Sequence, residues 1–358
     1  MNQVQAQLAP VCKKLTTGAV PFTLEVHAGA EPVAEALINV FNGVFPEYTG
    51  SAPPTLRFSL HPADDFDPTL IASATKPFAL RRSSALPFNL DLLLSLDDGT
   101  GVVAYDPKTL TGYIVNRNQA SIAFYVTNDS LFHLVETLRY TLLMAEQNRS
   151  TLILHASAAQ TDQGDLMLVL GDKGRGKTTT LLSMVLRDKL RYFSGDKVLA
   201  DIVDGALRLR AWPDYAHVGI GTFSLFPDFA RACGISLTDD NGQPRPNGEK
   251  HLVAPDRFAH ALDAVPERQA SCVSHVILPD VTAEGPLIRD LPLTTLPGRF
   301  DGILEDARQF TPGCWHQLTE NKAPVAADVI FAALSDARWV EVLGRDVPLS
   351  ELLDAAEA

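Results

Sequence analysis

The chain has 358 residues, of which 46% are hydrophobic and 20% are charged, a composition typical of a globular protein with one large or two ordinary domains. Its formal net charge of −13 argues against a general affinity for nucleic acid or anionic membranes, because both require a basic surface. The four cysteines lie far apart and show no metal-binding spacing, which is typical of reduced thiols. The N-terminal residues lack the layout of a signal peptide, and no apolar run approaches the about 18 residues of a membrane-spanning helix. We therefore expect a cytoplasmic protein that binds neither nucleic acid nor membrane.

Residues 17–127 contain short strand-like segments separated by loops. The segments FTLEVHA, TLRFSLH, GVVAYDP and GYIVNRN combine β-branched and aromatic residues between turn signals, and the last two predict a hairpin around Asp-Pro-Lys. AEPVAEALINVFNGVF has helical spacing. A clear helix follows over NDSLFHLVETLRYTLLMAEQNRS, with Asp129 or Ser130 as its cap and its apolar residues in one stripe that predicts a single buried face. These elements predict an α+β N-terminal domain over residues 1–148, a candidate for substrate binding.

The remaining residues, 149–358, show the alternation of strands and helices that indicates an α/β domain. TLILHASAA predicts a strand, and LMLVLG is a continuous apolar run typical of a strand buried on both faces. The helix KTTTLLSMVLRD comes next, and then YFSGDKVLADIV and ALRLRAWP predict two strands around an Asp-Gly turn at 204–205. The stretch DDNGQPRPNGEK is a polar, turn-rich loop. We expect the three tryptophans, Trp212, Trp315 and Trp339, to anchor the core.

The segment GDKGRGKT fits the pattern G-x-x-x-x-G-K-[ST] of a phosphate-binding P-loop. In such a loop, consecutive backbone N–H groups surround an anion at a helix N-terminus, and glycines permit the tight curl. The lysine bridges the terminal phosphates and the hydroxyl contacts Mg²⁺. An apolar strand before the segment and a helix after it supply the required context. We therefore assign nucleotide binding to Gly171, Asp172, Lys173, Gly174, Arg175, Gly176, Lys177, Thr178 and Thr179.

A nucleotide-bound Mg²⁺ usually takes a further contact from an acidic side chain. Asp196 and Asp201 are the nearest candidates after the loop. In a motor or switch protein this acid follows four apolar residues, whereas RYFSGDKV places Asp196 at a strand start or a turn. The expected region also lacks the Asn/Thr-Lys-x-Asp motif that reads guanine. We therefore expect no GTPase switch, and we assign Mg²⁺ to Thr178 and Asp196.

The stretch from LILHASAA through the glycine-rich loop to ALRLRAWP resembles the catalytic core of the HPr kinase/phosphorylase group, which shares its fold with phosphoenolpyruvate carboxykinase. The resemblance covers about residues 150–215 and thins to GEKHLVAPDRF. It implies an α/β, P-loop core of the phosphoenolpyruvate carboxykinase type, with ATP and Mg²⁺ as cofactors. The elements that bind HPr are not evident, so HPr itself is not the expected substrate.

By position, the resemblance also implies roles for single residues. His155 matches a histidine near the phosphates, and Asp196 matches the second member of an acidic pair whose first member is replaced by Gly195. Lys250 falls near a position from which a basic residue reaches the phosphates. The loss of one carboxylate puts a complete kinase-and-phosphorylase cycle in doubt.

Phosphoryl transfer requires positioning, charge neutralisation and a group that takes the hydroxyl proton. We assign catalysis to Asp196, His155 and Lys177, with Asp196 as the proton acceptor. Two of these residues have a structural alternative, because His155 also suits a core histidine and Asp196 a turn cap. Arg208 and Arg210 share one face of a strand and either clamp phosphate or face solvent. We include Arg210 and Lys250 among the nucleotide-binding residues.

Three functions fit these residues. The first is an ATP-dependent kinase that phosphorylates a hydroxyl on a peptide, a protein or a small molecule. The second is a nucleotide-binding regulatory protein with little transfer activity, and the third is a P-loop ATPase without a phosphoacceptor. The sequence leaves the acceptor and a homo-oligomer open.

Overall fold

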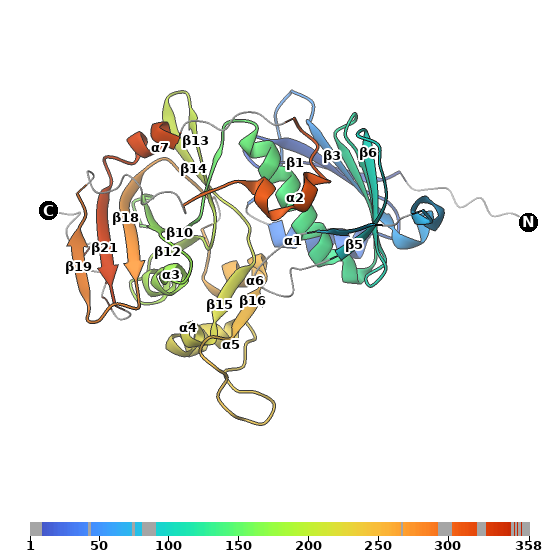
Figure 1. Ribbon diagram of the computed structural model, residues 1–358. Coiled ribbons are helices and arrows are strands. Elements are labelled where there is room, and N and C mark those ends of the chain that lie inside the picture. The colour runs from blue at the N-terminus through green and yellow to red at the C-terminus, as the bar shows by residue number, and fades with distance from the viewer. Residues whose placement is uncertain are drawn as a thin grey trace, which may run out of the picture. The chain divides into compact units, whose positions relative to one another are not determined.

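The computed structural model describes residues 9–41, 44–73, 76–80, 91–265, 268–292, 303–320 and 327–344, together with Val347, Leu349 and Leu352. The described residues form a mixed α/β structure with four sheets, and the chain divides into two compact units (Figure 1). Unit 1 consists of Met1–Ser150 and Asp306–Pro324, and unit 2 consists of Thr151–Glu305 and Val325–Ala358. The boundary after Ser150 lies two residues beyond the expected boundary after residue 148. Residues 306–324, which were expected in the second domain, belong to unit 1. No helix in the described part of the chain is long and apolar enough to cross a membrane.

Unit 1 contains an eight-stranded sheet of order β1-β2-β3-β8-β7-β6-β5-β4. Its strands are β1 (Val11–Thr16), β2 (Pro21–Val26), β3 (Leu56–Pro62), β4 (Lys76–Ala79), β5 (Asp91–Asp97), β6 (Gly101–Asp106), β7 (Thr111–Asn116) and β8 (Ser121–Val126). The pairs β2–β3 and β3–β8 are parallel, and the other neighbours are antiparallel. The hairpin expected around Asp-Pro-Lys is confirmed, since it joins β6 to β7.

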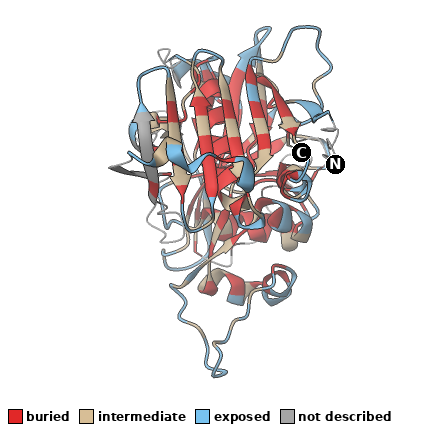
Figure 2. Ribbon diagram, turned by 90° about the vertical axis from the view of Figure 1, so that its right-hand side faces the viewer, coloured by how far each residue is buried: buried red, intermediate tan, exposed pale blue. Residues whose placement is uncertain are grey.

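The described part of this unit also contains the helices α1 (Glu31–Phe41) and α2 (Leu131–Gln147) and the short 3-10 turns η1 (Ala63–Asp65), η2 (Pro68–Ile71), η4 (Asn128–Ser130), η6 (Ala307–Phe310) and η7 (Pro312–Cys314). Buried and more exposed residues alternate along β6 and β8, as expected for strands with one covered face (Figure 2). Tyr113 of β7 connects the sheet to α2 and to the segment that contains Trp315. Its hydroxyl forms a hydrogen bond with His133 of α2, and its ring packs edge-on against Trp315. The segment 306–324 belongs to unit 1 for this reason.

The predicted helix over NDSLFHLVETLRYTLLMAEQNRS is confirmed, but its cap differs from the expected one. Thr127 and Ser130 form a capping box around η4, and Ser130 makes no side-chain cap bond at the start of α2 itself. The helix is also buried almost all round, including His133, Glu136 and Arg139. His133 pairs with Asp106, and Arg139 pairs with Glu136. The apolar stripe in the sequence therefore underestimates how much of the helix is covered.

Unit 2 contains a six-stranded sheet of order β12-β10-β11-β18-β21-β19, a five-stranded sheet of order β17-β14-β13-β9-β20 and the pair β15–β16. The strands are β9 (Leu152–Leu154), β10 (Ala156–Gln160), β11 (Leu166–Leu170), β12 (Arg191–Ser194), β13 (Val198–Val203), β14 (Ala206–Ala211), β15 (Ala216–Gly219), β16 (Lys250–Val253), β17 (Gln269–Ala270), β18 (Val273–Asp280), β19 (Leu287–Asp290), β20 (Leu304–Glu305) and β21 (Arg338–Leu343). The helices are α3 (Lys177–Leu186), α4 (Ile220–Leu225), α5 (Pro227–Ala232), α6 (Pro255–Ala261) and α7 (Ala327–Ala333).

β11 is buried on both faces, as the run LMLVLG predicts. Met167 and Val169 pack with Leu181 of α3 in one core cluster, whereas Leu168 packs with Phe193 in a second cluster. The two predicted strands around residues 204–205 form the hairpin β13–β14, whose turn residues both have positive φ. The three tryptophans are at most 4% exposed, which confirms them as core residues.

Candidate functional site

The glycine-rich loop leaves the carboxyl end of β11 at Gly171 and enters α3 at Lys177. Gly171, Gly174 and Gly176 have φ of 141°, 87° and 106°, in a region that side chains with a Cβ rarely adopt. A Cβ on Gly176 would also overlap the side chain of Val281, which follows β18. The first N–H groups of α3 have no partner within the helix, so this end of the helix suits an anion.

Lys177 lies beneath the loop at the start of α3 and is 8% exposed. Its Nζ donates to the carbonyl oxygens of Gly171, at 2.7 Å, and Asp172, at 3.4 Å. Burial lowers the pKa of Lys177, and the negative charges of Asp196 and Glu305 oppose that change. The ammonium therefore lies within the electrostatic reach of a carboxylate cluster.

Strand register brings that cluster to the loop. Ala156 of β10 pairs with Leu170 of β11, so His155, immediately before β10, lies beside the start of the loop. On its other side β10 pairs with β12 through Ala158 and Ser194. The hydroxyl of Ser157 donates to the carbonyl oxygen of Gly195 at 2.6 Å and holds the bend that carries Asp196.

His155 lies between two carboxylates. Its Nε2 is 3.4 Å from Asp196 Oδ1, and its Nδ1 is 3.2 Å from Glu305 Oε1. The strand β20 supplies Glu305 and pairs with β9, and the backbone N–H of His155 donates to Ile303 at 2.7 Å. Since both ring nitrogens face acids, the imidazole is oriented rather than packed as an apolar core side chain.

Lys197 is buried at 2% exposure among three carboxylates. Its Nζ lies 2.6 Å from Asp214 Oδ2, 2.9 Å from Asp196 Oδ2 and 3.3 Å from Glu305 Oε2. The carbonyl oxygen of Lys197 accepts bonds from the hydroxyl of Ser194, at 2.5 Å, and from the N–H of Trp212, at 3.3 Å. Both ends of this lysine are thus fixed.

Asp196 is the most exposed member, with 38% of its side chain accessible, against 4% for Asp214 and 9% for Glu305. Desolvation acts to raise its pKa, but the charge of Lys197 and the hydrogen bond from His155 outweigh desolvation and hold the pKa of Asp196 well below its ordinary value. Asp196 is therefore an ionised carboxylate at neutral pH with an accessible side, in a bend rather than in a strand, as the sequence indicates.

Arg210 and Asp201 belong to a separate ion-pair cluster on the hairpin β13–β14. Arg208 and Arg210 both donate to Asp201, with Arg210 Nη2 at 3.0 Å from Asp201 Oδ2. Arg210 is 3% exposed and Asp201 is 6% exposed. This cross-strand cluster holds β13 to β14, so a nucleotide phosphate would have to compete with Asp201 for Arg210.

The other candidates from the sequence occupy varied positions. Asp172, Lys173 and Arg175 are exposed on the loop, while Thr178 is half-buried in the first turn of α3. The hydroxyl of Thr179 lies 3.0 Å from that of Thr222 in α4.

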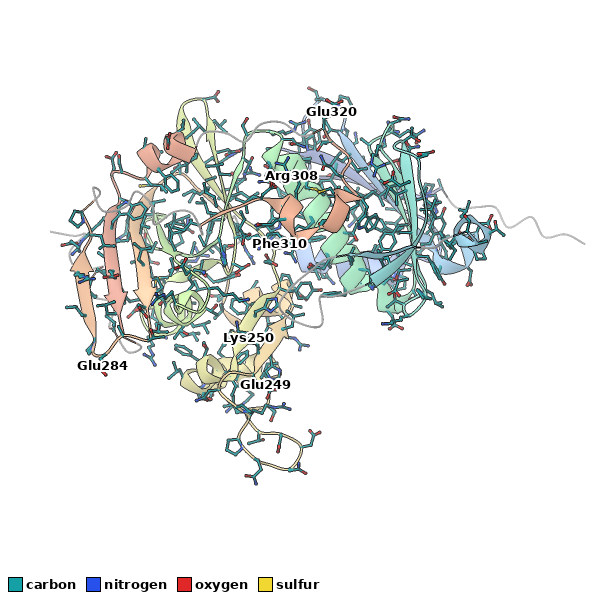
Figure 3. The ribbon with its side chains drawn as sticks, in the orientation of Figure 1. Glu249, Lys250, Glu284, Arg308, Phe310 and Glu320 are labelled. Carbon is teal, nitrogen blue, oxygen red and sulfur yellow. The ribbon has the colours of Figure 1, made fainter. Side chains whose placement is uncertain are left out.

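Lys250, labelled in Figure 3, is exposed at the start of β16. It pairs in register with Gly219, the residue before α4. Lys250 therefore lies in the hairpin that leads into α4, which meets the first turn of α3 through Thr222 and Thr179, and no described contact joins Lys250 to the loop.

Four residues with charged side chains at or beside this site were missed by the sequence analysis: Lys197, Asp214, Glu305 and Asp280. Asp280 ends β18, which runs parallel to β11, and Arg175 of the loop donates to its Oδ2 at 2.5 Å. The run HVILPD is an apolar stretch followed by Asp, the pattern expected of a magnesium-binding acid, so a local signal for Asp280 is present in the sequence. Asp214 and Glu305 carry no local signal.

Within the described ranges, no group of three or more His, Cys, Asp or Glu side chains is arranged to hold a metal ion. The assignment of Mg²⁺ to Thr178 and Asp196 therefore concerns an ion that arrives with a nucleotide and takes ligands from its phosphates. All four cysteines are free thiols.

No protein-family model matches the chain, and the search of curated proteins returned no significant match.

Proposed function

We propose that the protein is an ATP-dependent phosphotransferase that moves the γ-phosphate to a hydroxyl group on a peptide, a protein or a small molecule. The single observation that carries this proposal is the convergence of the glycine-rich loop with His155 and Asp196 in unit 2. A loop that only stored a nucleotide would not need an oriented histidine–carboxylate pair beside it, whereas phosphoryl transfer uses such a group to orient the attacking nucleophile. The resemblance of this stretch to HPr kinase-like proteins supports the same class.

The loop binds the triphosphate in this proposal. Its glycines allow close approach of the backbone, and the N-terminus of α3 stabilises negative charge. Lys177, which donates to Gly171 and Asp172 in the structure, turns to the β- and γ-phosphates. Thr178 and Asp196 are the residues that would hold Mg²⁺, which neutralises charge on the transferred group.

Asp196 acts on the acceptor hydroxyl. Because its pKa is held well below the ordinary value, it is a weak base that remains ionised, and it accepts a hydrogen bond from the hydroxyl. In a loose phosphoryl-transfer transition state the hydroxyl loses its proton late, so orientation matters more than base strength. His155 fixes Asp196 Oδ1 from one side and leaves the exposed side for the acceptor.

Incubation with γ-labelled ATP and Mg²⁺ tests the proposal, first with the protein itself as acceptor and then with pools of peptides and hydroxylated metabolites. Lys177→Ala and Asp196→Asn should each lower label transfer by about 10²- to 10³-fold, and Lys177→Ala should also weaken ATP binding. Lys13→Ala and Asp228→Asn, at exposed positions, serve as matched controls. Full transfer by Asp196→Asn would remove Asp196 from the mechanism.

A P-loop ATPase is the second candidate, and Asp280 favours it. Asp280 lies at the carboxyl end of a strand parallel to β11, from which its carboxylate would reach an Mg²⁺ ion beside the loop in this alternative. This alternative predicts phosphate release without labelled product, and loss of that release in Asp280→Asn.

A further inference from the structure

Lys197 stands out among the buried charges described in unit 2 because three carboxylates surround its ammonium group. Three oxygens from three carboxylates, on Asp196, Asp214 and Glu305, face its Nζ at 2.6 to 3.3 Å. Carboxylate oxygens gathered around one point are the donor set of a hard divalent cation. Here an ammonium group occupies that point.

The surrounding residues fix the lysine in this position. Ser194 and Trp212 hold its carbonyl oxygen, and β13 begins at the next residue. Asp214 and Glu305 are almost fully buried, so without a cation their charges would be strongly destabilising. The preceding residue, Gly195, contributes no further carboxylate to the cluster.

We infer that Lys197 serves as a built-in cation that replaces a protein-bound divalent metal ion at this site and positions Asp196 for the reaction. Its ammonium holds Asp196 Oδ2, while His155 faces Oδ1, so the carboxylate is oriented before any nucleotide arrives. In the reaction, the only divalent ion at these carboxylates is the one that enters with ATP. For its catalytic meaning the inference rests on the proposed function, but the metal site itself is testable without it.

The test is a Mn²⁺ titration of the full-length protein without nucleotide, followed by electron paramagnetic resonance of the free ion. Lys197→Gln removes the cation and leaves the three carboxylates, so it should gain one Mn²⁺ site with a dissociation constant at least about tenfold below that of any site in the unaltered protein. Lys197→Arg keeps a cation and should bind no more Mn²⁺ than the unaltered protein. Lys197→Gln combined with Asp214→Asn should lose most of the gain.

Two results would overturn the inference: a folded Lys197→Gln protein that gains no Mn²⁺ site, or an unaltered protein that already binds Mn²⁺ as tightly as Lys197→Gln does. If Lys197→Gln unfolds without metal, refolding in Mn²⁺ supports the inference. Failure to refold in Mn²⁺, with Lys197→Arg folded, counts against it. If Lys197→Gln gains a Mn²⁺ site but the unaltered protein never transfers phosphate, the inference about Lys197 stands and the proposed kinase activity is wrong. Failure of the inference and failure of the proposed function can therefore be distinguished.

Discussion

Each unit contains a histidine that faces a carboxylate, and the two histidines differ in exposure. In unit 1, His133 is 2% exposed and lies between Asp106, at 3.0 Å, and the hydroxyl of Tyr113, at 2.8 Å. In unit 2, His155 is 24% exposed and its partner Asp196 is 38% exposed. The closed arrangement contributes to folding, whereas the open one retains atoms that a ligand can reach. The difference shows that pairing of a histidine with an acid does not by itself indicate chemistry.

Acidification should produce the largest change, a loss of stability that comes from the buried polar groups of unit 1. Burial lowers the pKa of His316, which lies against the hydroxyl of Thr141, to about 3. The unfolded chain therefore binds a proton that the folded unit does not, and stability falls as pH drops below the unfolded value of about 6.5. Between pH 6.5 and pH 4 this amounts to about 3 kcal/mol.

Urea unfolding followed by tryptophan fluorescence at pH 7, 5.5 and 4 measures this loss. His316→Gln should be less stable at pH 7 but should lose much less on acidification. A pH dependence that is the same in both proteins would exclude His316 as its source.

Substitution of His155 and of His133 should give the next largest effects, on phosphate transfer and on stability respectively. These two variants directly test the comparison between the open and the closed histidine. His155→Asn should lower phosphate transfer by about 10²-fold with little change in melting temperature, because it removes the group that orients Asp196. His133→Asn should instead lower the free energy of unfolding by about 2 kcal/mol and leave transfer per folded molecule unchanged.

Calorimetry and the labelled-ATP assay read the two properties separately. The exposed His260→Asn is the control and should change neither. Equal losses of activity from the two variants would erase the distinction between a closed and an open histidine.

The sequence was informative where the determinants are local. The glycine-rich loop, β11 and α3 follow one another, so a motif with its flanks predicted their positions, and the positive φ values of the three glycines agree with the expected tight curl. Lys197, Asp214 and Glu305 come together only through the pairing of β9 with β13 and β20, across more than a hundred residues. No spacing rule links them, and a lysine beside an aspartate usually indicates a solvated surface.

The same limit applies to unit 1. The apolar stripe of α2 predicted one buried face, but residues 306–320 cover further parts of the helix, as the contact of His316 with Thr141 shows. A segment so distant in sequence leaves no trace in helical periodicity. The division of the chain into residues 1–148 and 149–358 placed this segment in the other domain for that reason.

Asp106 should contribute a smaller amount to the closed network. Desolvation acts to raise its pKa, but bonds from His133 and from the N–H of Lys108 lower it to about 2. The ionised form therefore stabilises unit 1 above the unfolded pKa of about 3.9, and this contribution is lost as pH falls from about 4 toward 2. Asp106→Asn should cost about 2 kcal/mol at pH 7 and flatten the acid dependence in that range.

Denaturant titrations at pH 7 and pH 3 measure this cost, and Asp64→Asn, at an exposed position, is the control. A variant that loses 2 kcal/mol equally at both pH values would point to packing rather than to the ionised carboxylate.

The smallest effect on stability and nucleotide binding should come from the exposed ion pair between the glycine-rich loop and the end of β18. Arg175 is 49% exposed and pairs with Asp280, so the pair adds little to folding. Arg175→Ala should leave the melting temperature unchanged and weaken binding of a non-hydrolysable ATP analogue by less than about fivefold, as measured by calorimetry. Asp280→Asn should behave in the same way if Asp280 only positions the loop. A loss of nucleotide turnover by Asp280→Asn of about 10²-fold or more would make Asp280 a metal ligand and would favour the ATPase over the kinase.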